Sequence, residues 1–237
     1  MKKLFIVIFL AMICIMPFAV NAESNTYTTY SGAVVEKTKY DKMCEIYSVN
    51  YVETLSQAEF DELSSKDLDN VVKVKYEENN NTRGSYFASS AKAVYFIKND
   101  NILTLTATWT AVPNVHSFDV MGVRLSGCTL NGGFAFKQTY VSSGSLYVVQ
   151  NGINQTFSNG FGSSALLQYG TDNEYTMTFK VSGSGTVYGT YQHAMASISQ
   201  SGSLDYTINL NGYGKVIAFS PSSALYYDQM NGVDIAV

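Results

Sequence analysis

The sequence has little of the residue types on which many enzymes and nucleic-acid-binding proteins depend. Among its 237 residues are two histidines, three cysteines, three prolines and one tryptophan. Lys and Arg total 15 against 19 Asp and Glu, a formal net charge of −4. Nucleic-acid binding needs clustered positive charge, so this balance argues against it. The sequence also lacks the Cys/His spacing of a zinc site, and we expect neither a metal nor a cofactor.

Long apolar runs are scarce as well, and the one that is present lies at the N-terminus. A lysine pair precedes an apolar stretch from Leu4 to Val20, and Val20-Asn21-Ala22 has small residues where signal peptidase needs them. We therefore expect a signal peptide over residues 1–22 and a single secreted β-sandwich domain over 23–237. The alternative is an uncleaved membrane anchor, because the run is about long enough to span a bilayer.

Two cysteines, Cys44 and Cys128, lie beyond the signal peptide. In an exported protein a disulfide between them is the first hypothesis. The alternative is a pair of buried free thiols that pack as small apolar residues.

Most of the chain after residue 70 has the pattern of short strands. Apolar and polar residues alternate along 101–111, 174–181 and 204–210, a period typical of half-buried antiparallel sheet. Turn signals such as Ser182-Gly183-Ser184-Gly185 separate the strands, and we expect 174–181 and 186–191 to form a hairpin. The fold class predicted is all-β, an antiparallel β-sandwich or jelly-roll.

One helix is predicted, near residues 56–64. Ser56 and Glu59 have the spacing of a capping box, in which each side chain bonds the other's backbone N–H. Phe60 and Leu63 then form an apolar pair one turn apart. Charged residues concentrate around this segment, between residues 36 and 83, and become sparse after residue 120.

The stretch 108–124 holds the residues to which we assign structural roles: Trp109, Pro113, Asp119, Gly122 and Arg124. Pro113 cannot lie inside a central ladder, so we expect a corner there between two neighbouring strands, 103–111 and 116–126. A β-bulge at Met121-Gly122 would bring four apolar residues beside Trp109 in the core, which are Phe118, Val120, Val123 and Leu125. Asp119 and Arg124 would then share the outer face, too far apart to pair, and find partners on adjacent strands.

This stretch resembles a group of secreted proteins from Gram-positive bacteria. The resemblance rests on Trp109, on Pro113 four residues later, and on the strand Ser117-Phe118-Asp119-Val120. It implies an exported bacterial protein and implies nothing about a mechanism.

Tyrosine is the residue type that most suggests a function, since there are 18 tyrosines and 13 phenylalanines. A tyrosine on the polar side of a strand can stack on a sugar ring or lie at a lipid interface. We take Tyr188, Tyr226 and Tyr227 as candidate binding residues. The hypothesis is a non-enzymatic secreted protein that acts by surface binding, with carbohydrate or protein as its partner.

Two alternatives stay open. The uncharged stretch 142–169 could refold into a membrane hairpin, as in a pore-forming β-protein, although its alternation is poor. A hydrolase is the third hypothesis, with His116 and His193 as the residues to test. We assign no catalytic residue, because His193 has the position of a strand-end residue and the carboxylates do not form a recognisable pair.

Overall fold

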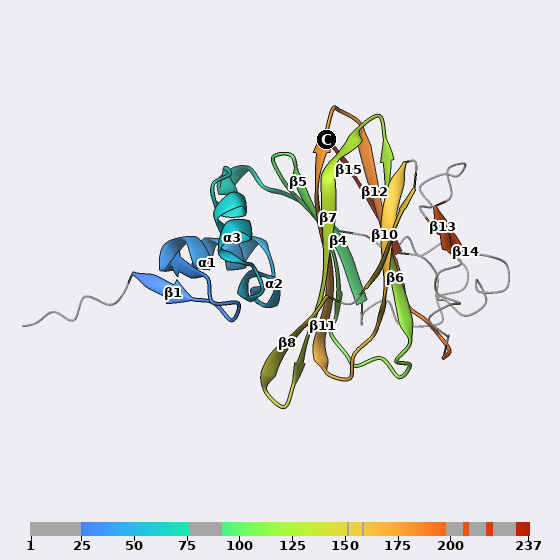
Figure 1. Ribbon diagram of the computed structural model, residues 1–237, viewed down its shortest axis with the longest axis horizontal. Coiled ribbons are helices and arrows are strands. Elements are labelled where there is room, and N and C mark those ends of the chain that lie inside the picture. The colour runs from blue at the N-terminus through green and yellow to red at the C-terminus, as the bar shows by residue number, and fades with distance from the viewer. Residues whose placement is uncertain are drawn as a thin grey trace, which may run out of the picture.

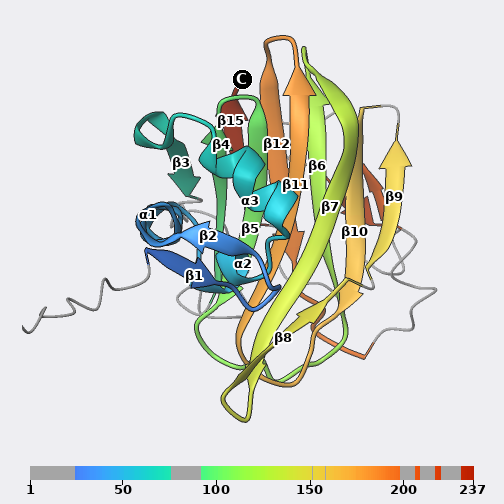
Figure 2. The ribbon, with the colours of Figure 1, turned by 60° about the vertical axis from the view of Figure 1, so that its left-hand side comes forward.

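The computed structural model describes residues 25–75, 92–150, 152–157, 159–197, 206–208, 217–219 and 231–237. Two antiparallel sheets pack face to face, and helices cover the outer face of one of them (Figures 1 and 2). The predicted antiparallel β-sandwich is thus confirmed. The signal peptide over 1–22, Tyr226 and Tyr227 lie outside the described residues.

The larger sheet has six strands, and the smaller has five. In spatial order the six are β3 (Val72–Lys75), β4 (Lys92–Asn99), β5 (Ile102–Trp109), β11 (Thr171–Ser182), β7 (Thr129–Ser142) and β8 (Ser145–Val149). The five are β15 (Asn231–Ala236), β12 (Thr186–Gln192), β6 (Phe118–Ser126), β10 (Gly160–Leu166) and β9 (Ile153–Phe157). A two-stranded ladder of β13 (Tyr206–Ile208) and β14 (Ile217–Phe219) lies beyond the smaller sheet (Figure 1).

A helical cap covers the outer face of the six-stranded sheet. It consists of β1 (Thr26–Thr28), β2 (Val34–Glu36), α1 (Lys37–Ile46), α2 (Val49–Glu53), α3 (Gln57–Ser64) and the 3-10 turn Leu68–Asn70. The capping box of Ser56 and Glu59 begins α3, as predicted. We did not predict α1 and α2. The reason is that α1 has no side-chain cap and buries only Met43, while α2 is five residues long.

Alternation along the strands places one apolar cluster on each side of the six-stranded sheet. In β5, Leu103, Leu105 and Trp109 belong to the cluster between the two sheets. The intervening Thr104 and Thr106 are also buried, because the cap covers the face on which they lie. A second cluster lies under the cap and includes Tyr51, Phe60 and Ile97. The polar residues of β5 therefore face the cap, whereas the sequence pattern suggested that they face water.

The strand β6 corrects two predictions. The ladder is regular through Gly122, which pairs with Gly162 on one side and Thr190 on the other, so the predicted bulge at Met121-Gly122 is wrong. Without the bulge, Met121, Val123 and Leu125 lie in the core between the sheets, and Asp119 shares their parity. The strand keeps its regular geometry because the buried Asp119 carboxyl is hydrogen-bonded, which alternation of apolar residues cannot reveal.

Two predicted strand pairings are also wrong. The strands β5 and β6 are in opposite sheets, and the loop with Pro113 crosses between them. Likewise β11 pairs with β5 and β7, while β12 pairs with β6 and β15, so the segment 183–185 is an arch between sheets. A Cβ atom on Gly185 would lie 2.1 Å from the carbonyl oxygen of Ser126. Glycine therefore permits the close backbone contact of this arch.

Candidate functional site

A chain of hydrogen bonds crosses from one sheet to the other through the core. Trp109 of β5 donates its indole N–H to the Tyr191 hydroxyl at 2.9 Å, and Tyr191 of β12 donates to the Asp119 carboxylate of β6. The Trp109 and Tyr191 rings meet edge to face. Burial, and then the charge of Asp119, raise the pKa of Tyr191 well above its ordinary value, so this hydroxyl keeps its proton.

His193 completes this cluster at the end of β12. Its Nδ1 lies 2.9 Å from Asp119 Oδ1, which also accepts the backbone N–H of Ala194 at 2.9 Å. Asp119 and His193 are each 1% exposed, so the pair is enclosed by protein. The sequence predicted His193 to be a strand-end residue, which it is, but did not connect it with Asp119. The enclosure favours a structural role, a cross-sheet tie, over a site that a substrate could enter.

The other predicted residues of this region are dispersed. Arg124 lies on the outer face of β6, with its guanidinium 4.8 Å from the ring centre of Tyr188 on β12. Tyr188 is half-buried, so part of its ring is covered by this cation. Pro113 is buried within the loop that crosses between the sheets. The predicted binding residue Tyr188 is thus already engaged by a neighbour within the protein.

The two cysteines do not form a disulfide, which was the first of the two hypotheses. Both are free thiols, and they belong to different layers. Cys44 packs against the cluster under the cap, whereas Cys128 is part of the core between the sheets. The six-stranded sheet separates these clusters, so the thiols act as packing residues.

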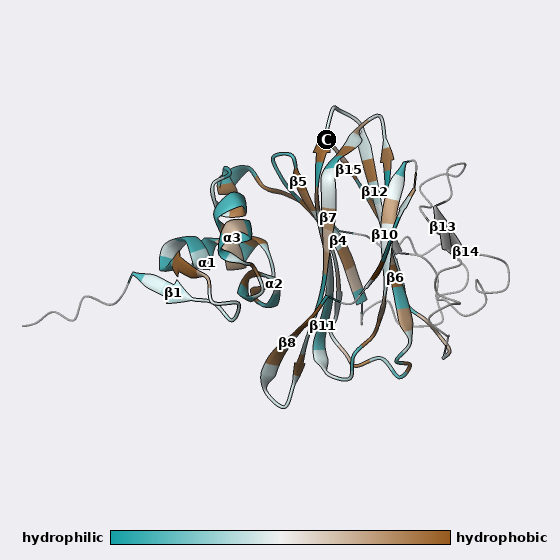
Figure 3. Cartoon of the chain, viewed as in Figure 1, coloured by the Kyte–Doolittle hydropathy of each residue, from teal (hydrophilic) through white to brown (hydrophobic). Residues whose placement is uncertain are grey.

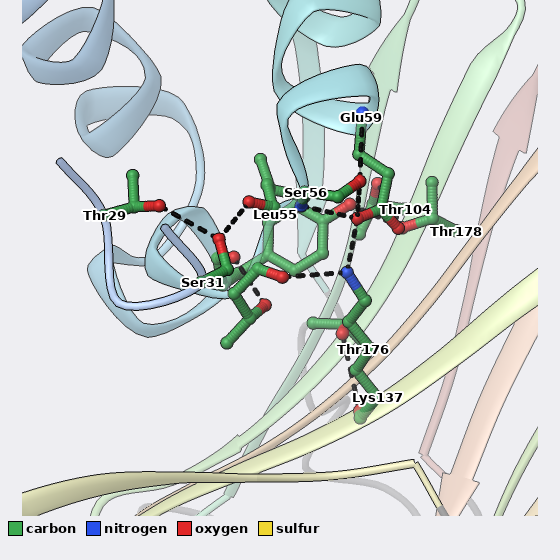
Figure 4. Close-up of polar contacts among 11 residues, drawn as sticks. Thr29, Ser31, Leu55, Ser56, Glu59, Thr104, Lys137, Thr176 and Thr178 are labelled. Atoms are coloured by element: carbon green, nitrogen blue, oxygen red, sulfur yellow. Dashed lines mark hydrogen bonds and ion pairs between the residues drawn. The ribbon is translucent and has the colours of Figure 1, made fainter. Parts of the chain in front are cut away.

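The cap is joined to the sheet by a seam of polar contacts (Figure 4). Lys137 of β7 is buried and donates to Glu59 Oε2 at 2.8 Å and to the carbonyl of Thr54 at 3.1 Å. Burial raises the pKa of Glu59, but hydrogen bonds from Lys137 and Ser56 outweigh this and hold it below its ordinary value. The ion pair at the start of α3 therefore anchors the cap to β7.

Hydroxyl groups continue the seam across β5 and β11. The Tyr51 hydroxyl of α2 lies 2.7 Å from Thr178 Oγ1. Thr178 Oγ1 in turn lies 3.2 Å from Thr104 Oγ1 (Figure 4). Burial raises the pKa of Tyr51 above its ordinary value. The face of the sheet that carries these threonines is therefore the surface against which the cap packs.

A cavity of about 460 Å³ opens beside this seam, between α2 and the ends of β5 and β11. Most of its lining residues are polar, and the complete set is Ser48, Val49, Asn50, Thr108, Trp109, Thr110, Asp172, Asn173 and Glu174. Ser48 donates to Glu174 Oε1 at 2.6 Å. Glu174 is 4% exposed, and burial raises its pKa to about 7. We call this the α2 cavity.

A bulge in β11 shapes the mouth of the α2 cavity. The pairing of β11 with β7 shifts between Thr171 and Glu174, and Asp172 has a φ of 50°, a value uncommon for a residue other than glycine. Asp172 is exposed, while Asn173 is buried and donates its amide to the carbonyl of Gly170 at 2.9 Å. Bulges re-aim side chains in this way beside binding sites.

Aromatic residues gather on β8 and neighbouring segments at the same end of the sandwich, and β8 lies at the lower end in Figure 1. Tyr140 and Tyr147 stack across β7 and β8 with ring centres 5.2 Å apart, and Tyr169 stacks on His116 at 3.9 Å. A Cβ on Gly170 would lie 2.7 Å from the Tyr140 ring, so the residue that follows Tyr169 packs against the first stack. Tyr169 is 76% exposed and Tyr147 43%. We call these four rings the aromatic strip.

The aromatic strip lies in hydrophobic surroundings that the sequence did not reveal. Val112 and Leu166, from the loop before β6 and the end of β10, are exposed at this end. The adjoining strand β8 is coloured largely hydrophobic in Figure 3. These residues are far apart in the sequence, and parity along single strands could not show that their loops meet.

The described residues hold no cluster of three His, Cys, Asp or Glu side chains that could bind a metal ion. No helix within the described ranges is long and apolar enough to cross a membrane. The arrangement offers stacking surfaces and hydrogen-bond acceptors, and the one close carboxylate–imidazole pair among the described residues is enclosed.

No protein-family model and no curated protein matches the sequence. Among solved structures, the KRT10-binding region domain of the pneumococcal serine-rich repeat protein PsrP is similar at 16% identity and a TM-score of 0.31, over 63% of this chain and 96% of that one. The pilus backbone RrgB of Streptococcus pneumoniae is similar at 11% identity and a TM-score of 0.32, over 70% of this chain and 47% of RrgB. This chain thus spans about half of RrgB. We draw no functional conclusion from likenesses this distant.

Proposed function

We propose that this chain is an exported, non-enzymatic β-sandwich protein that binds carbohydrate at its lower end. The aromatic strip carries the proposal. Exposed tyrosine rings combine an apolar face, on which a sugar ring can stack, with a hydroxyl that stays hydrated. The strip is formed by the β7–β8 hairpin and two loops at one end of the sandwich, and the ends of β-sandwich proteins commonly present binding residues.

Titration of a panel of neutral oligosaccharides by calorimetry tests this proposal. Tyr169→Ala removes the most exposed ring of the strip and should abolish measurable binding of whichever sugar the wild type binds. Tyr30→Ala is the matched control, because Tyr30 is 58% exposed but belongs to the cap. Equal binding by wild type and Tyr169→Ala would contradict the proposal.

Membrane activity is the second candidate, and one observation favours it. The strands β8 and β9, both within 142–169, are edge strands and pair on one side only among the described strands. Together with an exposed aromatic strip, such strands could leave their sheets for a lipid interface. Release of dye from liposomes by the wild type, lost in Tyr169→Ala, would replace the carbohydrate proposal with this one.

A further inference from the structure

The α2 cavity has a lining that selects the charge of its occupant. Its polar side chains offer acceptor oxygens, from two asparagines, from Asp172 and Glu174, and from three hydroxyl groups, and none of its lining residues is basic. Two carboxyl groups would repel an anion. A ligand group that carries several N–H donors and a positive charge fits this set of acceptors.

The carboxyl group of Glu174 points to the same occupant. Only Ser48, among the described residues, forms a hydrogen bond with it, and that bond uses a single carboxyl oxygen. A buried carboxylate without a cation partner is costly, which is the reason that burial raises the pKa of this group. A bound cation would compensate the charge of Glu174 and let it ionise inside the cavity.

The charged and titratable groups that surround Glu174 in the described part of the chain leave room for a cation beside its carboxyl group. From β3, Lys73 lies close enough to lower the pKa of Glu174, but its ammonium is 4.2 Å from the Tyr95 ring and it does not line the cavity. Tyr95, from β4, keeps its proton because burial raises its pKa. From β11 itself, Asp172 adds a second negative charge at the mouth. From α2, the groups are the neutral Ser48 and Asn50.

We propose that the α2 cavity binds a primary ammonium group, with Glu174 at the base and Asp172 at the mouth as its carboxylate partners. An ammonium is compact and has three N–H donors, which suits a cavity with acceptors on several sides. The group could belong to an amino sugar or to a lysine side chain. The amino-sugar form rests on the proposed carbohydrate function, since Asn173 joins this cavity to the loop that carries Tyr169.

The test compares three probes by calorimetry: a glucosamine oligomer, its N-acetylated counterpart, and a lysine-containing peptide. We expect the glucosamine oligomer to bind more tightly than the acetylated one, and Glu174→Gln to weaken its binding about tenfold or more. Asp172→Asn should weaken it as well, and serves as a second variant at an exposed position. Glu62→Gln, the same charge change on α3, should leave binding unchanged.

The outcomes separate the two proposals. Equal affinity for both sugars, unchanged in Glu174→Gln, would overturn the ammonium site and leave the carbohydrate proposal standing. Binding of the lysine peptide alone, lost in Glu174→Gln, would support the ammonium site and overturn its amino-sugar form. Binding of none of the probes would overturn the site.

Discussion

At the scale of single residues, Asp119 bears most on the stability of the sandwich. It accepts hydrogen bonds from Tyr191 and from the backbone of Ala194, and it lies against His193. We expect Asp119→Ala to lower the free energy of unfolding by about 3 kcal/mol or more, because it leaves these buried donors without an acceptor. Urea unfolding followed by tryptophan fluorescence measures this, since Trp109 belongs to the same cluster.

The exposed Asp234 of β15 provides the control for this prediction. Asp234→Ala should change the unfolding free energy by no more than about 0.5 kcal/mol. If both variants unfold at the same urea concentration, the cross-sheet tie does not stabilise the fold as argued.

Glu174 makes the free energy of unfolding depend on pH. The sign of this dependence is opposite to that caused by a salt-bridged carboxylate, whose pKa is lowered. Burial raises its pKa to about 7 from an ordinary 4.5. Between these two values the folded state binds more protons than the unfolded state, so the free energy of unfolding falls as pH rises. Glu174→Gln should therefore exceed the wild type in stability by about 3 kcal/mol above pH 7, at about 1.4 kcal/mol per pH unit, and by little below pH 4.5.

Urea unfolding of both proteins at several pH values checks this prediction. The difference between them should grow across the interval and then stay level. A constant difference, independent of pH, would show that Glu174 is ionised throughout and that the α2 cavity is more polar than its lining indicates.

At the scale of elements, the arch between β11 and β12 is the connection most sensitive to substitution. A Cβ on Gly185 would meet backbone atoms of Ser126, Gly127 and Cys128 within 3 Å. We expect Gly185→Ala to destabilise the protein by about 1–3 kcal/mol, as overpacking does. Gly133→Ala is the matched control because its Cβ would meet nothing within 4 Å. Equal melting temperatures for the two variants would argue against a tight arch.

The helical cap depends on Lys137 more than on the exposed ion pairs around it. Lys137→Met should remove the contacts with Glu59 and the Thr54 carbonyl and speed amide hydrogen exchange across α1, α2 and α3, with little change in β6 or β12. Lys180→Met is the control, because the Lys180–Glu62 pair is half-exposed and such pairs contribute little. Exchange measured by mass spectrometry that is equally fast in both variants would contradict a special role for Lys137.

Strand positions could be predicted from the sequence, and strand partners could not. Alternation located β5 and β11 because their apolar parity faces the core. It did not distinguish a hairpin from an arch after β11, since Gly-Ser-rich segments suit both. It also placed Phe118 and Val120 on the face of β6 between the two sheets, where Asp119 lies, because a buried carboxylate is satisfied by partners on other strands.

At the scale of the whole molecule, the aromatic strip and the α2 cavity are formed by segments that meet only in the folded chain. Tyr147, Tyr169 and His116 come from three separate strands or loops. The sequence predicted binding by tyrosine but did not predict these tyrosines, because the alternation within one strand pointed to Tyr188. Whether a tyrosine is exposed where several loops meet depends on the fold of the whole sandwich.

Export is the prediction that concerns the chain as a whole. Secretion with removal of residues 1–22 should give a product whose N-terminal sequence reads Glu23-Ser24-Asn25. Replacing Ala22 with a bulky residue such as Trp should block cleavage and keep the protein with the cell membrane. A secreted product of full length, or a cytoplasmic one, would contradict the signal peptide.

The arch also determines when folding can be completed. Each sheet takes strands from distant parts of the chain: β6, near the middle, pairs with β10 and β12, and β12 needs β15. Val237 exchanges two backbone hydrogen bonds with Gly185 in the arch itself. Pairing over such sequence separations is slow compared with local hairpins. A chain that leaves the cell with its N-terminus first would therefore stay open during passage, and would close its five-stranded sheet only after β15 had emerged.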